Sequence, residues 1–177
     1  MKNKNMQWFV HRLIERYADH QTDALDLTMG NGHDTCFLTE HFRHVYAFDK
    51  QSQALESTRQ RLAAAHKTNV TLTQCDHGAL LINDVPHVSL IVFNAGYLPG
   101  GDKSMITQAT STVHALKTAF EALRSPGVLI MTLYTHPGGL EEKEAVVSWL
   151  NQLPHARLSR YHLMHVHHAP EVYVCEI

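Results

Sequence analysis

The sequence predicts an α/β fold with a central, mostly parallel seven-stranded sheet and helices on both faces. Short apolar runs alternate with longer amphipathic runs, a rhythm typical of βαβ units. Two apolar runs, 88–94 and 127–134, are nearly continuous, as expected for central strands covered on both faces. Two further strand-like segments, 156–166 and 171–177, are separated by only four residues. Because so short a link cannot hold a crossover helix, we expect an antiparallel hairpin at this end.

The other elements follow from the same patterns. Further strands are expected at 23–28, 44–49 and 69–74. Helices are expected at 33–41, 51–66, 104–123 and 139–152. Residues 1–20 are expected to form an amphipathic helix, with Trp8, Phe9, Leu13 and Tyr17 near one face. Since we find no repeat, low-complexity tract or linker, residues 1–177 are expected to form a single domain.

Composition excludes several classes of protein. Lys plus Arg number 15 against 17 Asp plus Glu, which does not fit a highly basic nucleic-acid coat. Fifteen histidines could still add positive charge beside an RNA backbone. Three widely spaced cysteines without a CxxC pair argue against a disulfide scaffold or structural zinc, and favour a reduced, cytoplasmic protein. No apolar run approaches the roughly 20 residues of a membrane span, so no membrane partner is expected.

The segment LDLTMGNGHDT, residues 25–35, is a candidate ligand-binding loop. Gly30 and Gly32 follow the first strand, where ligands bind in doubly wound sheets. Such loops serve dinucleotides, nucleoside triphosphates or S-adenosylmethionine, and the absence of GK[ST] excludes the second. Thr35 stands in place of the third glycine of the dinucleotide fingerprint, and Asp34 would repel a diphosphate but tolerate a sulfonium ligand with an ammonium group. A tight turn in which Asp34 and Thr35 cap the next helix is the alternative.

Three acidic residues follow three successive expected strands. Asp49 could accept both hydroxyl groups of an adenosine ribose, and Asp76 could meet the adenine amino group with His77 beside it. Asp26 ends the first strand directly before the glycine loop. Each of these acids alone could instead cap a strand end, but three together favour S-adenosylmethionine.

The loops after the fourth and fifth strands hold the candidate acceptor site. In the sequence NAGY, the oxygen of Asn94 could accept a hydrogen bond from an acceptor amine and aim its lone pair, while Tyr97 supports a flat base. His136 is a candidate to receive a proton. An ordinary Asn-Gly turn and a bystander histidine are the alternatives. His165 and His167 are two residues apart, but no carboxylate or cysteine pattern accompanies them, so no metal site is predicted.

These motifs resemble a known family. Five parallel strands followed by an antiparallel hairpin are the layout of class I methyltransferases. The strings DLTMGNGHDTCFL, FNAGYLPGGDKSMITQATSTVHAL and HPGG resemble small bacterial methyltransferases described as rRNA methylases, over roughly residues 22–177. The resemblance implies transfer of a methyl group from S-adenosylmethionine to the amine of 5-aminomethyl-(2-thio)uridine at tRNA wobble position 34. The implied partner is the tRNA anticodon stem-loop.

The resemblance also assigns site residues by matched position. For the cofactor it implies Asp26, Thr28, Gly30, Asn31, Gly32, His33, Asp34, Thr35, Asp49, Lys50, Gln51, Asp76, His77, Asn94 and Gly96. It also matches the loop of Asn94 and Tyr97, which are the candidate catalytic residues together with His136 from the loop after the fifth strand. Two features depart from the family pattern. Met29 replaces a small residue and could narrow the loop, and YTHPGG is one residue shorter than the corresponding family segment, which leaves the place of His136 open.

Other functions stay open at this point. They are a methyltransferase for rRNA or a small amine, an NAD-linked oxidoreductase, and a cofactor-binding module without catalysis. The first helix, with Lys2, Lys4, Arg12 and Arg16, could contact RNA or simply be solvated. The sequence does not decide whether the chain forms a homodimer.

Overall fold

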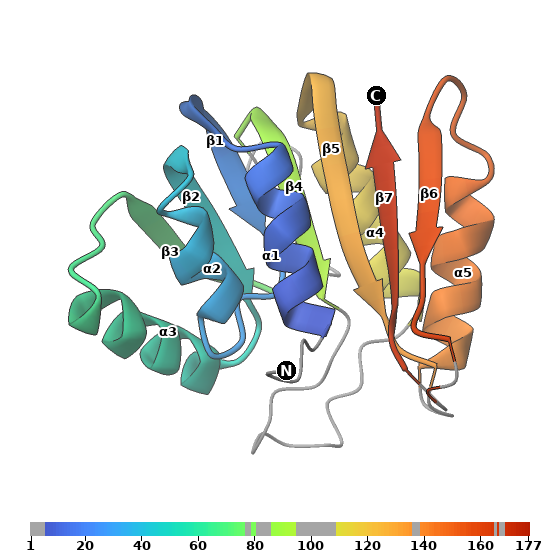
Figure 1. Cartoon of the computed structure of the whole chain (residues 1–177). Coiled ribbons are helices and arrows are strands. Elements are labelled where there is room, and N and C mark those ends of the chain that lie inside the picture. The colour runs from blue at the N-terminus through green and yellow to red at the C-terminus, as the bar shows by residue number, and fades with distance from the viewer. Residues whose placement is uncertain are drawn as a thin grey trace.

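The fold is built on one seven-stranded sheet with the strand order β3-β2-β1-β4-β5-β7-β6 (Figure 1). A computed structural model describes residues 6–76, 79–80, 86–94, 109–135, 139–164, 166 and 169–177. The strands are β1 Asp19–Asp26, β2 Phe42–Asp49, β3 Val70–Gln74, β4 Val88–Asn94, β5 Leu123–Leu133, β6 Arg157–Tyr161 and β7 Glu171–Glu176. The helices are α1 Met6–Arg16, α2 His33–Leu38, α3 Ser52–Ala64, α4 Ala109–Glu121 and α5 Leu140–Leu150.

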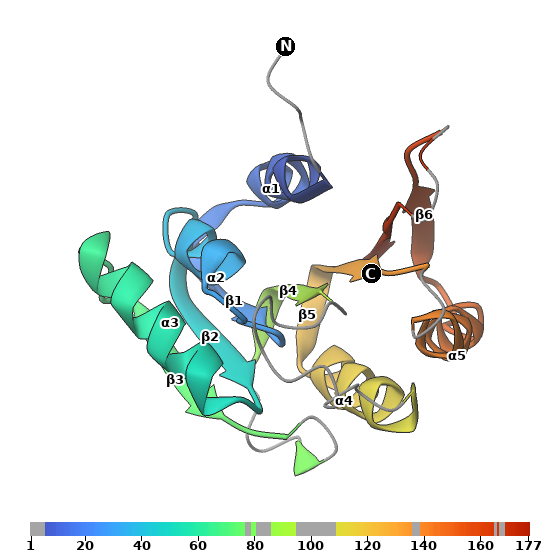
Figure 2. The same ribbon diagram turned by 90° about the horizontal axis from the view of Figure 1, so that it is seen from below.

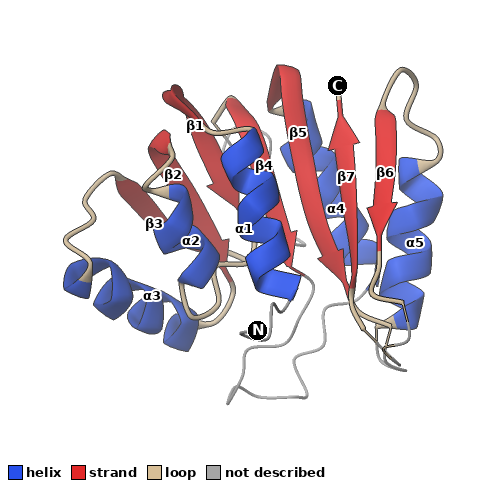
Figure 3. Ribbon diagram, in the orientation of Figure 1, coloured by secondary structure: helices blue, strands red, loops and turns tan. Residues whose placement is uncertain are grey.

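The strand directions confirm the predicted mostly parallel sheet. Neighbouring strands from β3 to β5 pair in parallel, whereas β7 pairs antiparallel with both β5 and β6. Figure 3 shows helices between β1 and β2, between β2 and β3 and between β4 and β5, and the two C-terminal strands at one end of the sheet. All five parallel strands therefore bring their carboxyl ends to one edge, the lower edge in Figure 1.

Helices cover both faces of the sheet, as predicted. Figure 2 shows α1, α2 and α3 on one face and α4 and α5 on the other. Strand β4 is apolar from Leu90 to Phe93 because it serves both layers: Ile91 and Phe93 join the core under α4 and α5, and Leu90 and Val92 join the core under α1. Burial on both faces explains why this run lacks the alternation of a half-exposed strand.

The N-terminal helix is shorter than predicted. It ends at Arg16, and Asp19 and His20 belong to β1, because Asp19 pairs with Phe42 of β2 in the sheet. Its buried residues are Val10, Leu13 and Ile14. Met6, Phe9 and Tyr17 pack partly buried beside them. The expectation for Trp8 was wrong, since its side chain lies 39% exposed.

Strand β5 begins earlier than predicted and β6 ends earlier. Pro126 looks like a strand breaker, yet β5 runs from Leu123 through it, with a register shift against β4. Gly127 exchanges backbone hydrogen bonds with Ile177, and a Cβ on Gly127 would lie only 2.1 Å from the carbonyl oxygen of Arg124. Because β6 pairs with β7 only over Arg157–Tyr161, the hairpin link is residues 162–170 rather than four residues. His165 and His167 lie outside the described residues.

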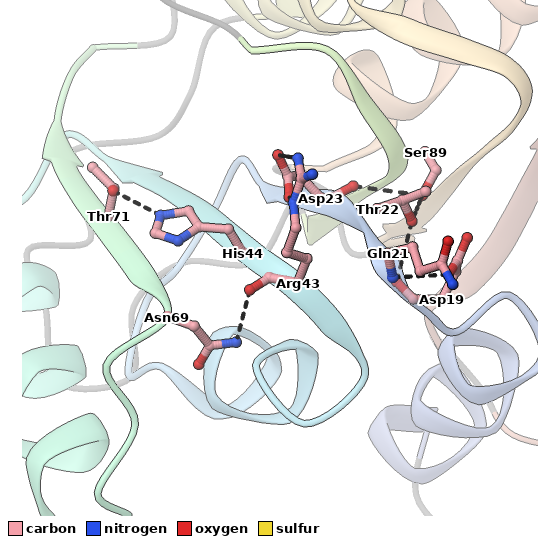
Figure 4. A network of polar contacts seen from close by, with 9 residues as sticks. All are labelled: Asp19, Gln21, Thr22, Asp23, Arg43, His44, Asn69, Thr71 and Ser89. Atoms are coloured by element: carbon pink, nitrogen blue, oxygen red, sulfur yellow. Dashed lines mark hydrogen bonds and ion pairs between the residues drawn. The ribbon is translucent and has the colours of Figure 1, made fainter.

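The amino edge of the sheet carries a polar network, drawn in Figure 4. Its members are Asp19, Gln21, Thr22, Asp23, Arg43, His44, Asn69, Thr71 and Ser89. The Asp23 carboxylate is buried and accepts two hydrogen bonds from Arg43, from Nε and Nη2, each at 2.8 Å. This bidentate pair joins β1 to β2 at the edge opposite the glycine loop.

Within the described part of the chain, no helix is long and apolar enough to cross a membrane.

We predict that Arg43→Ala lowers the free energy of unfolding, because it leaves the Asp23 carboxylate buried without its cation. Since the Arg43 side chain is 58% exposed, we expect a smaller loss than for a fully buried pair. Urea unfolding of both proteins measures it. Arg59→Ala is the matched control, because its pair with Glu56 is exposed on both sides. Equal losses in the two variants would contradict a special role for the Asp23 pair.

Candidate functional site

The candidate site lies at the carboxyl edge, where β1, β2 and β4 end next to one another. These strands finish in Asp26, Asp49 and Asn94, so three polar side chains meet at one edge. The segment from Thr28 to Thr35 runs between the end of β1 and the first turn of α2. Doubly wound sheets bind ligands at this position.

Asp26 holds both ends of the glycine loop. Its Oδ1 accepts a hydrogen bond from the backbone N–H of Thr28 at 3.0 Å, and its Oδ2 accepts one from the Thr35 hydroxyl at 2.6 Å. Burial, and next the nearby Asp34 carboxylate, raise the pKa of Asp26 from its ordinary 3.8 to about 7. Asp26 therefore fixes the conformation of the loop, and both its carboxylate oxygens already accept hydrogen bonds from the protein.

Asp49 holds the middle of the loop from β2. Its Oδ2 accepts a hydrogen bond from the N–H of Gly30, and its Oδ1 accepts one from the N–H of Gln51, each at 3.0 Å. A carboxylate has about four acceptor positions, so these bonds leave Asp49 able to accept further donors. Its side chain is thus fixed in direction at the place expected for a ribose.

Helix α3 supports the loop from behind, through residues that the sequence did not single out. Thr58 donates to the carbonyl oxygen of Gly30 at 3.1 Å, and Arg61 Nε donates to that of Asn31 at 2.7 Å. Arg61 also contacts His33 Nε2 at 3.0 Å. Burial, and next the Arg61 charge, lower the pKa of His33. Thr58 and Arg61 are three residues apart and so share one face of α3. This spacing is the only feature of the sequence that could have indicated that both contact the loop.

Gly32 is required by both conformation and space. Its φ of +75° lies in the left-handed region, and a Cβ there would come within 2.9 Å of the Thr58 backbone. Gly32 is also the residue before α2, and no described side chain caps that helix. The alternative in which Asp34 and Thr35 cap α2 is not borne out, because the Thr35 hydroxyl bonds to Asp26 and the Asp34 carboxylate contacts α1.

Asn94 connects β4 to the same loop. Its backbone N–H donates to the Thr28 hydroxyl at 2.7 Å. Its side-chain oxygen Oδ1 is buried, and no residue in the described part of the chain donates a hydrogen bond to it. A buried acceptor without a donor is costly, so this oxygen is suited to a donor from a bound molecule.

Met29 does not narrow the loop, contrary to the expectation from its size. Its side chain is buried in a small cluster with Ala47 and Ala54, with Leu55 and Leu72 packed against it. Met29 therefore fixes the loop to β2 and α3.

The remaining predicted residues divide into two groups. Lys50 and Asp76 lie close to the ends of β2 and β3, and the carbonyl of Lys50 accepts a hydrogen bond from the Gln74 side chain. Asp76 is exposed there. His77, Gly96, Tyr97 and His136 lie outside the described residues.

The charges at the edge favour a cationic ligand. Asp34 and Asp49 both act on the carboxylate of Asp26, so three acids surround the loop. This field would oppose a diphosphate and attract an ammonium or sulfonium group. In the described ranges, no group of three or more His, Cys, Asp or Glu side chains is arranged to hold a metal ion.

Comparison with known proteins identifies the family. The family model described as "Putative rRNA methylase" matches residues 45–176. The chain belongs to this family of class I methyltransferases. A curated relative, the chloroplastic tRNA (mnm(5)s(2)U34)-methyltransferase of Arabidopsis thaliana, is 35% identical over 159 residues. That match covers 81% of this chain and 58% of the relative, so the chain spans somewhat more than half of that protein.

Solved structures of the family have the same fold. A protein of Clostridium thermocellum described as a "putative rRNA-methylase" superposes with a TM-score of 0.88 at 29% identity, over 99% of each chain. A methyltransferase of Streptococcus mutans, solved with S-adenosylhomocysteine (SAH), superposes at 0.87 with 34% identity, again over 99% of each chain. These matches and the β5-β7-β6 order confirm the predicted Rossmann-like class I methyltransferase fold, and set aside the NAD-linked oxidoreductase.

We predict that Gly32→Ala lowers the free energy of unfolding by about 1–3 kcal/mol, the usual cost of a strained backbone position. Urea unfolding measures the change. Adding Thr58→Ala should not restore stability, because the Thr58 Cα itself lies 2.9 Å from the new Cβ. Full recovery in the double variant would show that the Thr58 side chain alone causes the loss.

A second prediction concerns Asp26 and pH. Because the folded-state pKa of about 7 exceeds the ordinary 3.8, the folded protein binds the extra proton between these values. The contribution of Asp26 to stability is therefore fully present below the ordinary pKa and is lost as pH rises through the folded one. Urea unfolding at about pH 5.5 and about pH 8 should show a smaller fall in stability for Asp26→Asn than for the wild type. The exposed Asp19 is the control position, and Asp19→Asn should keep the wild-type fall.

Proposed function

We propose that this protein methylates the exocyclic amine of 5-aminomethyl-(2-thio)uridine at tRNA position 34, giving the 5-methylaminomethyl nucleoside, with S-adenosylmethionine (SAM) as methyl donor. The observation that carries the proposal is the buried side-chain oxygen of Asn94, to which no described residue donates a hydrogen bond and which suits the N–H of an amine. The Arabidopsis relative, named for this wobble modification, supports the choice of amine. The SAH complex of the Streptococcus mutans relative supports the choice of donor.

The residues at the carboxyl edge fit SAM. The Asp49 carboxylate, fixed by the N–H groups of Gly30 and Gln51, would accept the ribose hydroxyl groups. The backbone of the loop would lie against the ligand, since Gly30 and Gly32 carry no side chain. Asp76 would meet the adenine end of the site. The surrounding carboxylates favour the positive charge of the donor, and SAM supplies an electrophilic methyl group when bound.

Asn94 would align the acceptor. Its Oδ1 would accept one N–H of the neutral amine and so direct the nitrogen lone pair along the required line. The hydrogen bond from its backbone N–H to Thr28 holds Asn94 against the donor loop, so the acceptor and donor sides are fixed relative to each other. Tyr97 and His136 stay proposed as a support for the base and as a proton acceptor.

The family description favours rRNA as a second candidate substrate. To separate the candidates, purified protein is incubated with methyl-labelled SAM and one of three RNAs: tRNA carrying 5-aminomethyl-2-thiouridine, the same tRNA without the modification, or rRNA. We expect label only in the first RNA, as the 5-methylaminomethyl nucleoside. Label in rRNA, or equal label in both tRNAs, would refute the wobble assignment.

We predict that Asn94→Ala abolishes methyl transfer but changes the SAM dissociation constant only a few-fold, because its side chain orients the acceptor. Single-turnover transfer and calorimetry with SAM measure the two effects. Asn151→Ala, a substitution at the exposed end of α5, is the matched control and should retain full activity. Parallel loss of SAM binding in Asn94→Ala would instead mean that Asn94 only holds the loop.

A further inference from the structure

Helix α1 makes a direct contact with the donor loop. His11 Nε2 lies 2.8 Å from Asp34 Oδ1, and Gln7 Nε2 lies 3.5 Å from the same oxygen. The two helix residues are one turn apart and so share a face. Both partners of the close contact are largely shielded, with side chains 20% exposed for His11 and 12% for Asp34.

The His11 ring is held rigidly. It stacks on Phe37 with ring centroids 3.9 Å apart and planes only 7° from parallel. Helix α1 itself is anchored, because Val10, Leu13 and Ile14 are buried against β4, β5 and β7. A rotation of the Asp34 carboxylate would therefore break its contact with His11, whose position is set by Phe37 and by the packing of α1.

Asp34 and Asp49 lie on different sides of the glycine loop. Asp49 ends β2 and engages Gly30, at the side expected for the nucleoside. Asp34, two residues after Gly32, faces α1, which covers β4 and β5. SAM has a nucleoside at one end and an amino acid with an α-ammonium group at the other. With the nucleoside at Asp49, the amino acid of SAM would extend toward Asp34.

We propose that His11 is a positioning residue that holds the Asp34 carboxylate to receive the α-ammonium group of the methionine part of SAM. The inference rests on the proposed use of SAM. Oδ1 takes the contacts with His11 and Gln7, and no described side chain bonds to Oδ2, which is then available to the ammonium. Helix α1 thus belongs to the donor site although it precedes the first strand.

The test compares three ligands that differ at the amino-acid end. SAM and SAH both carry the α-ammonium group, whereas 5′-methylthioadenosine keeps the nucleoside and thioether but lacks the amino acid. Calorimetry with His11→Ala should show about tenfold weaker binding of SAM and SAH, the usual effect of losing a hydrogen bond to a charged group. Binding of 5′-methylthioadenosine should be unchanged. Asp34→Asn should give the same pattern, and adding His11→Ala to it should cause little further loss.

Two variants separate positioning from packing. His41 also contacts the Phe37 ring, at 4.6 Å between centroids, so His41→Ala perturbs the same aromatic group without touching Asp34 and should bind SAM normally. His11→Gln keeps a side-chain N–H donor and should recover most of the SAM affinity. An equal loss for all three ligands, or an effect of His41→Ala as large as that of His11→Ala, would overturn the inference. Failure of the wild type to bind SAM would refute the proposed function instead.

Discussion

The backbone between β1 and α2 is held by carboxylates rather than by regular secondary structure. Asp26 and Asp49 each accept two hydrogen bonds, and together they fix Thr28, Gly30, Thr35 and the start of α3. Burying acids so close together raises the free energy of their charged forms. A cationic ligand relieves that cost, so the same constraint that shapes the loop also selects what it binds.

The supports for this loop come from elements far apart in the sequence. Strand β2 provides Asp49, helix α3 provides Thr58 and Arg61, and helix α1 provides His11. Strand β4 joins through the hydrogen bond between Asn94 and Thr28. A ligand at this edge is therefore in contact with a framework that spans both the donor and acceptor sides.

Much of the fold could be predicted because single strands and loops carry strong local signals. The run 88–94 coincides with β4, since burial on both faces makes it nearly continuously apolar. The start of β5 at Leu123 could not be predicted, because Pro126 looks like a strand breaker and only pairing with β4 extends the strand before it. The polar first residues of β1, from Asp19, could not be predicted as strand for the same reason, because only their pairing with β2 makes them part of the sheet.

Some features of the candidate site could likewise be predicted from the sequence and others could not. That Asp26, Asp49 and Asn94 meet could be predicted, because parallel strands bring their carboxyl ends to one edge of the sheet. The contact between His11 and Asp34 depends on how α1 packs, and no spacing in the sequence reports that. The expectation for Met29 failed because the sequence gives the size of its side chain but not the direction in which the side chain points, which is into the cluster with Ala47 and Ala54.

The position of β7 has a consequence for synthesis on the ribosome. Val172 and Val174 of β7 share the core under α1 with residues of β4 and β5, and the Tyr17 hydroxyl donates to Glu176 at 2.8 Å. Helix α1 leaves the ribosome long before β7 does. The part of its apolar face that β7 covers therefore stays exposed to premature association until β7 inserts between β5 and β6.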